Sequence, residues 1–134
     1  MTDNRAASYG VLVLRVALGI MFIAHSAYLK LMVFTLPGTA RFFESLGLPG
    51  ASAYLVFGAE LVGGILLLVG WQTRRAAAAL VPILLGATWA HGKNGWLFTN
   101  TGGGWEYPLF LAVATLALAL IGRSAWSLDA RWAY

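Results

Sequence analysis

Two histidines and one glutamate are the side chains of this sequence best suited to proton transfer. They are His25, Glu60 and His91, and each lies within or beside a run of apolar residues. Charged groups are costly in such surroundings, about 2.5–3.5 kcal/mol for Arg, Lys or Asp at the centre of a membrane helix, so they usually pair or serve a function. We therefore predict that Glu60, with His25 or His91, forms a proton donor and acceptor pair beside a bound redox or aromatic molecule.

A structural interpretation of Glu60 remains open beside the functional one. An ion pair between Glu60 and Lys30 or His25 would simply join the first helix to the second. The two interpretations are compatible, because a buried pair is also one way in which a protein perturbs a pKa.

The two histidines alone do not predict a haem or metal site. Two His side chains on different helices could ligate a b-type haem, or a metal together with Glu60. The sequence, however, contains no HxxxH or ExxH spacing and no cysteine. We expect neither haem nor a metal.

A dense polar and aromatic stretch, HGKNGWLFTNTGGGWEYPLF, runs from His91 to Phe110. Its Trp96, Trp105 and Tyr107 either form an aromatic belt at a membrane interface or wall a pocket for a flat ring, and the sequence leaves both open. The glycines at 102–104 do not predict a phosphate loop, because no strand precedes them and no Lys-Ser/Thr follows. We expect them to let the backbone turn beneath Trp105.

Four apolar segments must position these residues, and they predict four spanning helices. Sixty per cent of the 134 residues are hydrophobic, only 10% are charged, and the mean hydropathy is +0.75. A soluble domain is about 45–50% apolar and about 25% charged. We expect one all-α domain over residues 1–134, an integral membrane antiparallel four-helix bundle in contact with lipid. The predicted helices are about 11–34, 52–71, 76–90 and 108–121, with an outer loop at 91–107.

The remaining segments are expected to be short and peripheral. Residues 1–8 predict an exposed tail, and residues 123–134 a polar tail that carries tryptophan. Leu36-Pro37-Gly38 predicts a break, followed by a short amphipathic turn at residues 39–46 in the interface.

The basic residues predict the orientation of the bundle. With four spans, six of the nine basic residues lie on the side of both termini, so the positive-inside rule places that side in the cytoplasm. The loop 91–107 then faces outward, towards a periplasm or cell exterior. A rise of about 1.5 Å per residue brings one polar set to this outer end, while Arg15 lies apart. The set comprises His25, Lys30, Glu60, His91, Lys93 and Glu106. The scattered charges, +4 in total, form no basic run and predict no nucleic-acid binding.

Most of the chain resembles the DoxX family of small bacterial four-helix membrane proteins. The resemblance rests on LRVALGIMFIAHSAYLKL (14–31), FFESLGLPGASAY (42–54), GAELVGGILLLVGWQTRRAA (58–77) and, most specifically, the loop HGKNGWLFTNTGGGWEYPLF. It implies a membrane component of a quinone-linked oxidoreductase or quinone-stress system, with quinone as cofactor and redox subunits as partners. The residues that it implies for a quinone-side pocket are His25, Lys30, Glu60, His91, Asn94, Trp96, Trp105, Glu106 and Tyr107.

Two other functions stay open, as does the question of whether the chain is catalytic alone. The first is a non-catalytic membrane subunit or assembly factor that docks a partner protein. The second is a carrier of small solutes, which at this length would have to form a homo-oligomer and shows no inverted repeat.

Overall fold

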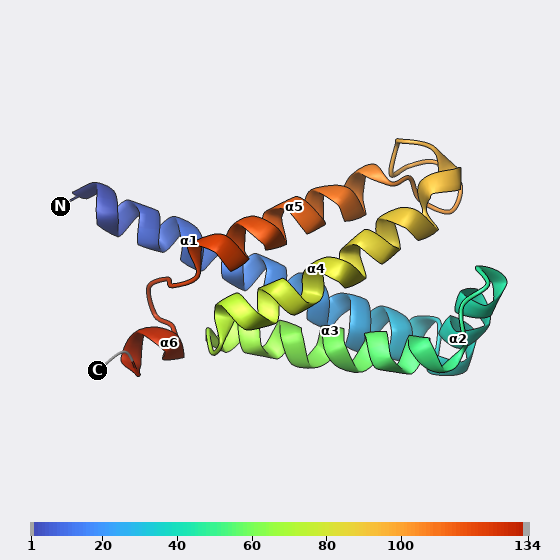
Figure 1. Ribbon diagram of the computed structural model, residues 1–134, viewed down its shortest axis with the longest axis horizontal. Coiled ribbons are helices and arrows are strands. Elements are labelled where there is room, and N and C mark those ends of the chain that lie inside the picture. The colour runs from blue at the N-terminus through green and yellow to red at the C-terminus, as the bar shows by residue number, and fades with distance from the viewer. Residues whose placement is uncertain (1, 133–134) are drawn as a thin grey trace.

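The computed structural model describes residues 2–132, which form helices joined by short turns and one longer loop (Figure 1). Helix α1 (Thr2–Ile23) continues directly into the π-helix η1 (Ala24–Val33), and α2 (Leu36–Ser45) follows. Helices α3 (Ala51–Val69) and α4 (Thr73–Ala90) come next, before the 3-10 turn η2 (Gly92–Asn94). The chain ends with α5 (Glu106–Ile121) and the short α6 (Leu128–Arg131). No β-strand occurs within residues 2–132.

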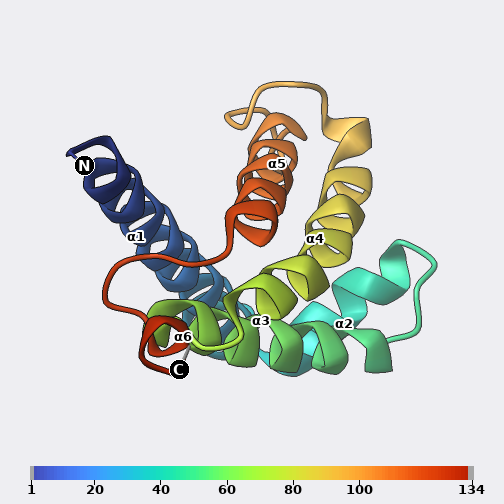
Figure 2. The same cartoon turned by 60° about the vertical axis from the view of Figure 1, so that its left-hand side comes forward.

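The four long helical segments contact one another in sequence around a ring. Helix α1 packs on α3, α3 on α4, α4 on α5, and α5 returns to α1. The short helix α2 crosses one end of this arrangement and contacts α3 and η1 (Figure 2). Both termini lie at the end opposite α2 and the loop 91–107 (Figure 1).

Glycines set the close crossing of α1 and α3. A Cβ atom on Gly64 would lie 3.0 Å from the carbonyl oxygen of Gly19 and 2.9 Å from the Ile23 side chain. Both glycines are therefore needed for the two backbones to approach, as at small-residue contacts between membrane helices. The core beside this crossing is formed by Leu18, Phe22, Leu67, Leu80, Leu84 and Leu118, among others.

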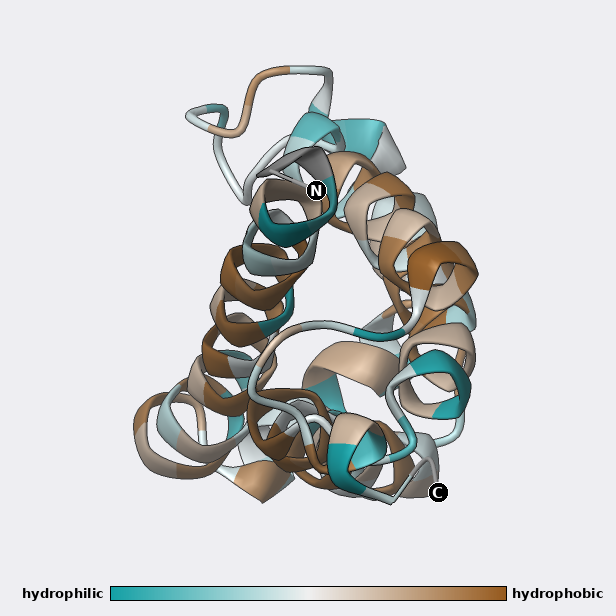
Figure 3. Cartoon of the chain, turned by 90° about the vertical axis from the view of Figure 1, so that its left-hand side faces the viewer, coloured by the Kyte–Doolittle hydropathy of each residue, from teal (hydrophilic) through white to brown (hydrophobic). Residues whose placement is uncertain are grey.

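The long helices consist mostly of hydrophobic residues (Figure 3), and many large apolar side chains on them are exposed. Two helical stretches, Asn4–Val33 and Ala51–Val69, are long and apolar enough to cross a membrane, and only 22% and 28% of their most apolar windows are buried. A core helix of a water-soluble protein would be mostly buried. Exposed apolar faces of this extent require an apolar environment or a partner.

Arg15 joins three segments at the end that carries the termini. It is 1% exposed, and its guanidinium donates to the carbonyl of Leu67 and, at 2.7 Å, to that of Leu68 at the end of α3. It also donates to Ser124 Oγ at 2.8 Å and to the carbonyl of Trp126. Arg15 thus fixes the C-terminal segment to α1 and α3, far from the polar residues of the opposite end.

The structure differs from the predicted break and turn at residues 36–46. Pro37 lies in the first turn of α2, where proline is favoured because the missing N–H has no helical partner. Thr35 caps this helix by accepting a hydrogen bond from the Gly38 N–H at 3.2 Å. The residues predicted as a break therefore begin a helix.

The two predicted tails are also corrected. Helix α1 begins at Thr2, because the residues before Val11 contain nothing that stops a helix and include Ala6 and Ala7, which favour one. The C-terminal segment forms α6, whose Ser127 accepts from the Ala130 N–H at its first turn. Its backbone is tied to the α3–α4 turn by a 2.9 Å bond from Asp129 N–H to the Gly70 carbonyl.

Candidate functional site

The polar residues predicted for the outer end come from four helical segments that meet there. His25 and Lys30 lie on η1, Glu60 lies within α3, and His91 follows the last residue of α4. Tyr107 lies in the first turn of α5. These five residues line one cavity of about 580 Å³ between α1, α4 and α5.

The π-helical form of η1 brings His25 and Lys30 towards the same region. In an α-helix, residues five positions apart are rotated by about 140° around the axis. The i→i−5 hydrogen bonding of a π-helix, seen in the 2.8 Å bond from Phe34 N–H to the Leu29 carbonyl, widens each turn and reduces that rotation. His25 and Lys30 accordingly line the same cavities.

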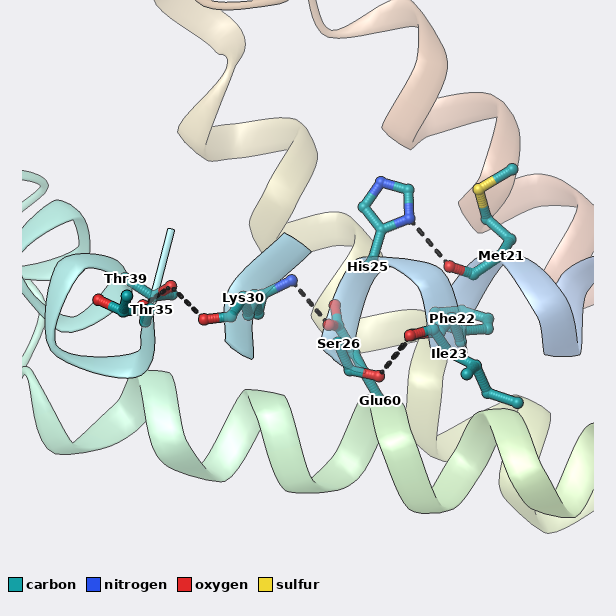
Figure 4. A network of polar contacts seen from close by, with 9 residues as sticks. All are labelled: Met21, Phe22, Ile23, His25, Ser26, Lys30, Thr35, Thr39 and Glu60. Atoms are coloured by element: carbon teal, nitrogen blue, oxygen red, sulfur yellow. Dashed lines mark hydrogen bonds and ion pairs between the residues drawn. The ribbon is translucent and has the colours of Figure 1, made fainter. Parts of the chain in front are cut away.

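Lys30 and Glu60 form a largely buried ion pair between η1 and α3. The Nζ–Oε2 distance is 2.7 Å, and the side chains are 15% and 8% exposed (Figure 4). Removing one partner of such a pair leaves an uncompensated charge, which typically costs about 3–5 kcal/mol. The pair predicted between these helices is therefore present, and its partner is Lys30 rather than His25.

His25 is held by its own helix and not by the ion pair. Its Nδ1 lies 3.0 Å from the Met21 carbonyl (Figure 4). Because a carbonyl oxygen only accepts hydrogen bonds, we assign the proton to Nδ1, which leaves Nε2 as the free nitrogen of the neutral ring. The ring stacks on Tyr107, with centroids 6.4 Å apart and planes at 27°. Tyr107 in turn donates from its hydroxyl to Met21 Sδ at 2.8 Å.

His91 is fixed by the glycines of the outer loop. Its Nδ1 lies 3.0 Å from the Gly102 carbonyl, so the same reasoning leaves its Nε2 free. Asn94 supports this arrangement by donating to the carbonyls of Gly102 at 3.1 Å and Gly103 at 2.8 Å. Gly102 and Gly103 have φ values of +80° and +78°, which favour glycine.

Four of the predicted pocket residues build the loop and do not line the cavity. Asn94 holds the glycine turn, and the rings of Trp96 and Trp105 meet edge to face at 4.5 Å. Glu106 accepts from the Phe98 N–H at 3.1 Å through its side chain. These residues shape the loop above the cavity rather than its wall.

A second, larger cavity adjoins the first. It has a volume of about 920 Å³ and runs between η1, α2, α3 and α4. The residues that line both cavities are His25, Lys30, Glu60, Ala87 and His91. All three side chains predicted to handle protons therefore lie where the two cavities meet.

The apolar walls of these cavities were not predicted from the sequence. Met21, Phe22 and Phe98 line the smaller one, while Phe42 and Phe43 of α2 line the larger one. In a sequence, an apolar residue of a cavity wall looks the same as an apolar residue of a packed core. The exception is the pair Phe42-Phe43, whose place in an amphipathic segment could have indicated an apolar wall. Within the described residues, no three His, Asp or Glu side chains gather in a way that could hold a metal ion.

The sequence matches a known protein family and two named relatives. The sequence pattern of the DoxX family matches residues 10–93, which include His25, Lys30, Glu60 and His91. The chain is 33% identical over 127 residues to "Putative oxidoreductase CatD" of Bacillus subtilis (strain 168), covering 94% of this chain and 89% of that protein. It is 31% identical over 126 residues to "Inner membrane protein YqjF" of Escherichia coli (strain K12), covering 90% and 89%. No solved structure matches the chain.

The apolar exterior, the helical architecture and these matches agree with one another. The matched region spans more than half of the sequence, and both relatives align along nearly all of it. The chain is a membrane protein of the DoxX family.

Proposed function

We propose that this protein is an inner-membrane component of a quinone-linked oxidoreductase system that binds a quinone at the outer end of four spanning helices. The observation that carries the proposal is the meeting of two cavities at His25, Lys30, Glu60 and His91. Ligand sites are commonly apolar cavities of about 300–1,000 Å³ with a few placed polar groups. One relative bears the name oxidoreductase and another the name inner membrane protein, which supports the same assignment.

The residues present fit a quinone ring. Met21, Phe22 and Leu111 offer apolar contact to a flat ring, and Tyr107 adds an aromatic face on one side. The free Nε2 atoms of His25 and His91 provide hydrogen-bonding groups for ring oxygens. A bound quinone supplies two-electron, two-proton redox chemistry, with electrons exchanged with a redox partner subunit.

The protein's own residues hold and move protons in this proposal. His25, with Nδ1 fixed on the Met21 carbonyl, presents Nε2 as the group that gives or takes a proton at a ring oxygen. Glu60 holds Lys30 in place at 2.7 Å, and it relays protons when that pair opens. The loop held by Asn94 and Glu106 limits the access of water to the smaller cavity from the outer side of the membrane.

The test measures quinone in a lipid extract of the protein purified in mild detergent. We expect Glu60→Gln to lower the bound quinone at least fivefold, because Lys30 loses its partner and the junction of the cavities rearranges. The exchange variant Lys30→Glu/Glu60→Lys restores an ion pair, so we expect it to recover the thermal stability. Its carboxylate, however, lies on η1 instead of α3, and we therefore expect quinone binding to stay low. Glu44→Gln, on the exposed surface of α2, is the control.

The outcomes separate the two roles of Glu60. Equal quinone content in the wild-type protein and Glu60→Gln would refute a role at the quinone site. Full recovery of quinone in the exchange variant would assign Glu60 to the ion pair alone and leave proton handling to the histidines.

A second candidate function is a non-catalytic subunit that docks a partner protein. It is favoured by the exposed apolar tip of the outer loop, where Trp96, Leu97 and Phe98 are 54%, 51% and 63% exposed. A membrane interface would accommodate the same three residues. Stoichiometric co-purification of a partner that is lost in Trp96→Ser/Phe98→Ser, with no quinone in the extract, would favour docking.

A further inference from the structure

The larger cavity is an apolar groove with an open rim. It is walled by η1, α2, α3 and α4, and α2 lies across it with Phe42 and Phe43 in its lining. Phe34 and Trp89 also line it and are 57% and 60% exposed, so the groove reaches the apolar outer surface of the protein. Its inner end is the polar junction with the smaller cavity.

The charges at that junction restrict the groove's occupant. The residues lining the groove include one ammonium group, Lys30, and it is already paired with Glu60 at 2.7 Å. Apart from the imidazoles of His25 and His91, the lining therefore offers no unpaired basic side chain for the phosphate of a phospholipid headgroup. A neutral headgroup needs no cationic partner. It can therefore pass the junction and occupy the smaller cavity.

We propose that the groove holds a long hydrocarbon tail on the molecule whose ring occupies the smaller cavity. The ligand class is then a lipid-soluble, tailed quinone rather than a tailless aromatic compound. This inference rests on the proposed function and adds the substrate class and its route of access. The ring passes from the lipid through the groove beneath α2, crosses the Lys30–Glu60 junction and reaches His25.

Two glycines allow a matched test of this geometry. Gly86 on α4 lines the groove, and a Cβ atom added there meets nothing within 4 Å. Gly58 on α3 lines neither cavity, and its added Cβ also meets nothing within 4 Å. Leucine at either position favours the helix over glycine, so both variants are expected to fold. Gly86→Leu alone places a side chain in the groove.

The experiment uses the full chain in lipid nanodiscs with a tailed benzoquinone that carries a photoreactive diazirine at the end of its tail. Irradiation and peptide mass spectrometry locate the crosslinks. In the wild-type protein and Gly58→Leu we expect crosslinks within residues 34–48 and 82–90. In Gly86→Leu these crosslinks fall at least fivefold, while binding of the same ring without a tail changes less than twofold.

The results distinguish failure of this inference from failure of the proposed function. If neither quinone binds, the proposed function is wrong and the inference fails with it. If both quinones bind but the tail crosslinks lie elsewhere and are unchanged in Gly86→Leu, the inference alone is overturned. The inference alone is also overturned if a stoichiometric phospholipid, lost in Gly86→Leu, is found in the extract while the tail crosslinks persist.

Discussion

Glu60 and Arg15 are two charged residues buried within the described helices, 6% and 1% exposed as whole residues, and they lie towards different ends of the molecule. Glu60 pairs with Lys30 at the junction of the two cavities. Arg15 donates to several acceptors, three of them backbone carbonyls, and so has the satisfied surroundings of a structural residue. A buried charge therefore lies in the candidate site at one end of the molecule. At the other end, the hydrogen bonds of Arg15, which we call the Arg15 clamp, hold the C-terminal segment against α1 and α3.

Asp129 lies near Arg15 in the same part of the molecule, and its contribution to stability depends on pH. Its Oδ1 and Oδ2 accept from the backbone N–H groups of Gln72 at 2.7 Å and Thr73 at 2.9 Å, which caps the start of α4. Burial alone would raise the pKa of Asp129, but hydrogen bonds from Thr73 and Gln72 and the nearby Arg15 lower it below its ordinary value. Its contribution to stability is therefore present above the ordinary pKa of an aspartate and is lost as the pH falls through the lowered value.

We predict that Asp129→Ala destabilises the protein by about 1 kcal/mol at pH 7, the usual loss for a helix cap. The difference from wild type should shrink as the pH falls, because the wild-type carboxyl then becomes protonated as well. Thermal unfolding midpoints in detergent between pH 7 and the lowest pH that the detergent tolerates check this, with Glu44→Ala as the control. A difference that is independent of pH would contradict the assignment.

At the scale of the elements, two departures from simple helices position the site. The π-helix η1 brings His25 and Lys30 to the same cavities, and the glycine crossing of Gly19 and Gly64 sets α1 against α3. The crossing lies about one turn of α3 from Glu60, so it also holds Glu60 within reach of Lys30. Helix packing and site geometry are in this way linked along one interface.

Alanine substitutions at two glycines of α3 should shift stability in opposite directions. At Gly64 the added methyl group meets the Gly19 carbonyl and Ile23, which costs about 1–3 kcal/mol by overpacking. At Gly58 it meets nothing within 4 Å, and the gain in helix propensity stabilises by up to about 1 kcal/mol. Unfolding midpoints of the two variants test this, and equal effects would argue against the close α1–α3 crossing.

At the scale of the whole molecule, the structure separates the loop 91–107 and α2 from the two termini (Figure 1). Arg15, one of the six basic residues counted for the orientation, is buried, so it is a structural group and not a loop charge. Five exposed basic residues remain at the end with the termini, against Arg41 and Lys93 at the other. The positive-inside rule still favours cytoplasmic termini.

The absence of cysteine from the sequence allows a direct test of this orientation. Thr101→Cys lies exposed in the outer loop, and Ala130→Cys lies exposed in α6. A membrane-impermeant maleimide added to intact spheroplasts should label Thr101→Cys and leave Ala130→Cys unlabelled until the membrane is permeabilised. The reverse pattern would invert the proposed topology, and labelling of both would show that these two segments share a face.

The sequence by itself determined the helical class, the apolar exterior and the residues that could carry charge or protons. Composition and hydropathy are sums over residues, and Glu60, His25 and His91 stand out against apolar neighbours without any knowledge of packing. The sequence also suggested an ion pair at Glu60, but it could not choose between Lys30 and His25. The Pro37 and Ser127 helix starts were readable as capping signals in principle, since capping is local.

Only the tertiary structure decided which of these residues share a cavity. Whether Trp105 or Tyr107 faces the cavity depends on the path of a glycine loop, and whether Lys30 reaches Glu60 depends on the wide turns of η1. The groove beneath α2 is likewise a space between elements, and the apolar residues of its wall do not differ in type from core residues. Side-chain identity is a local property, whereas a cavity exists only once several helices have taken their places.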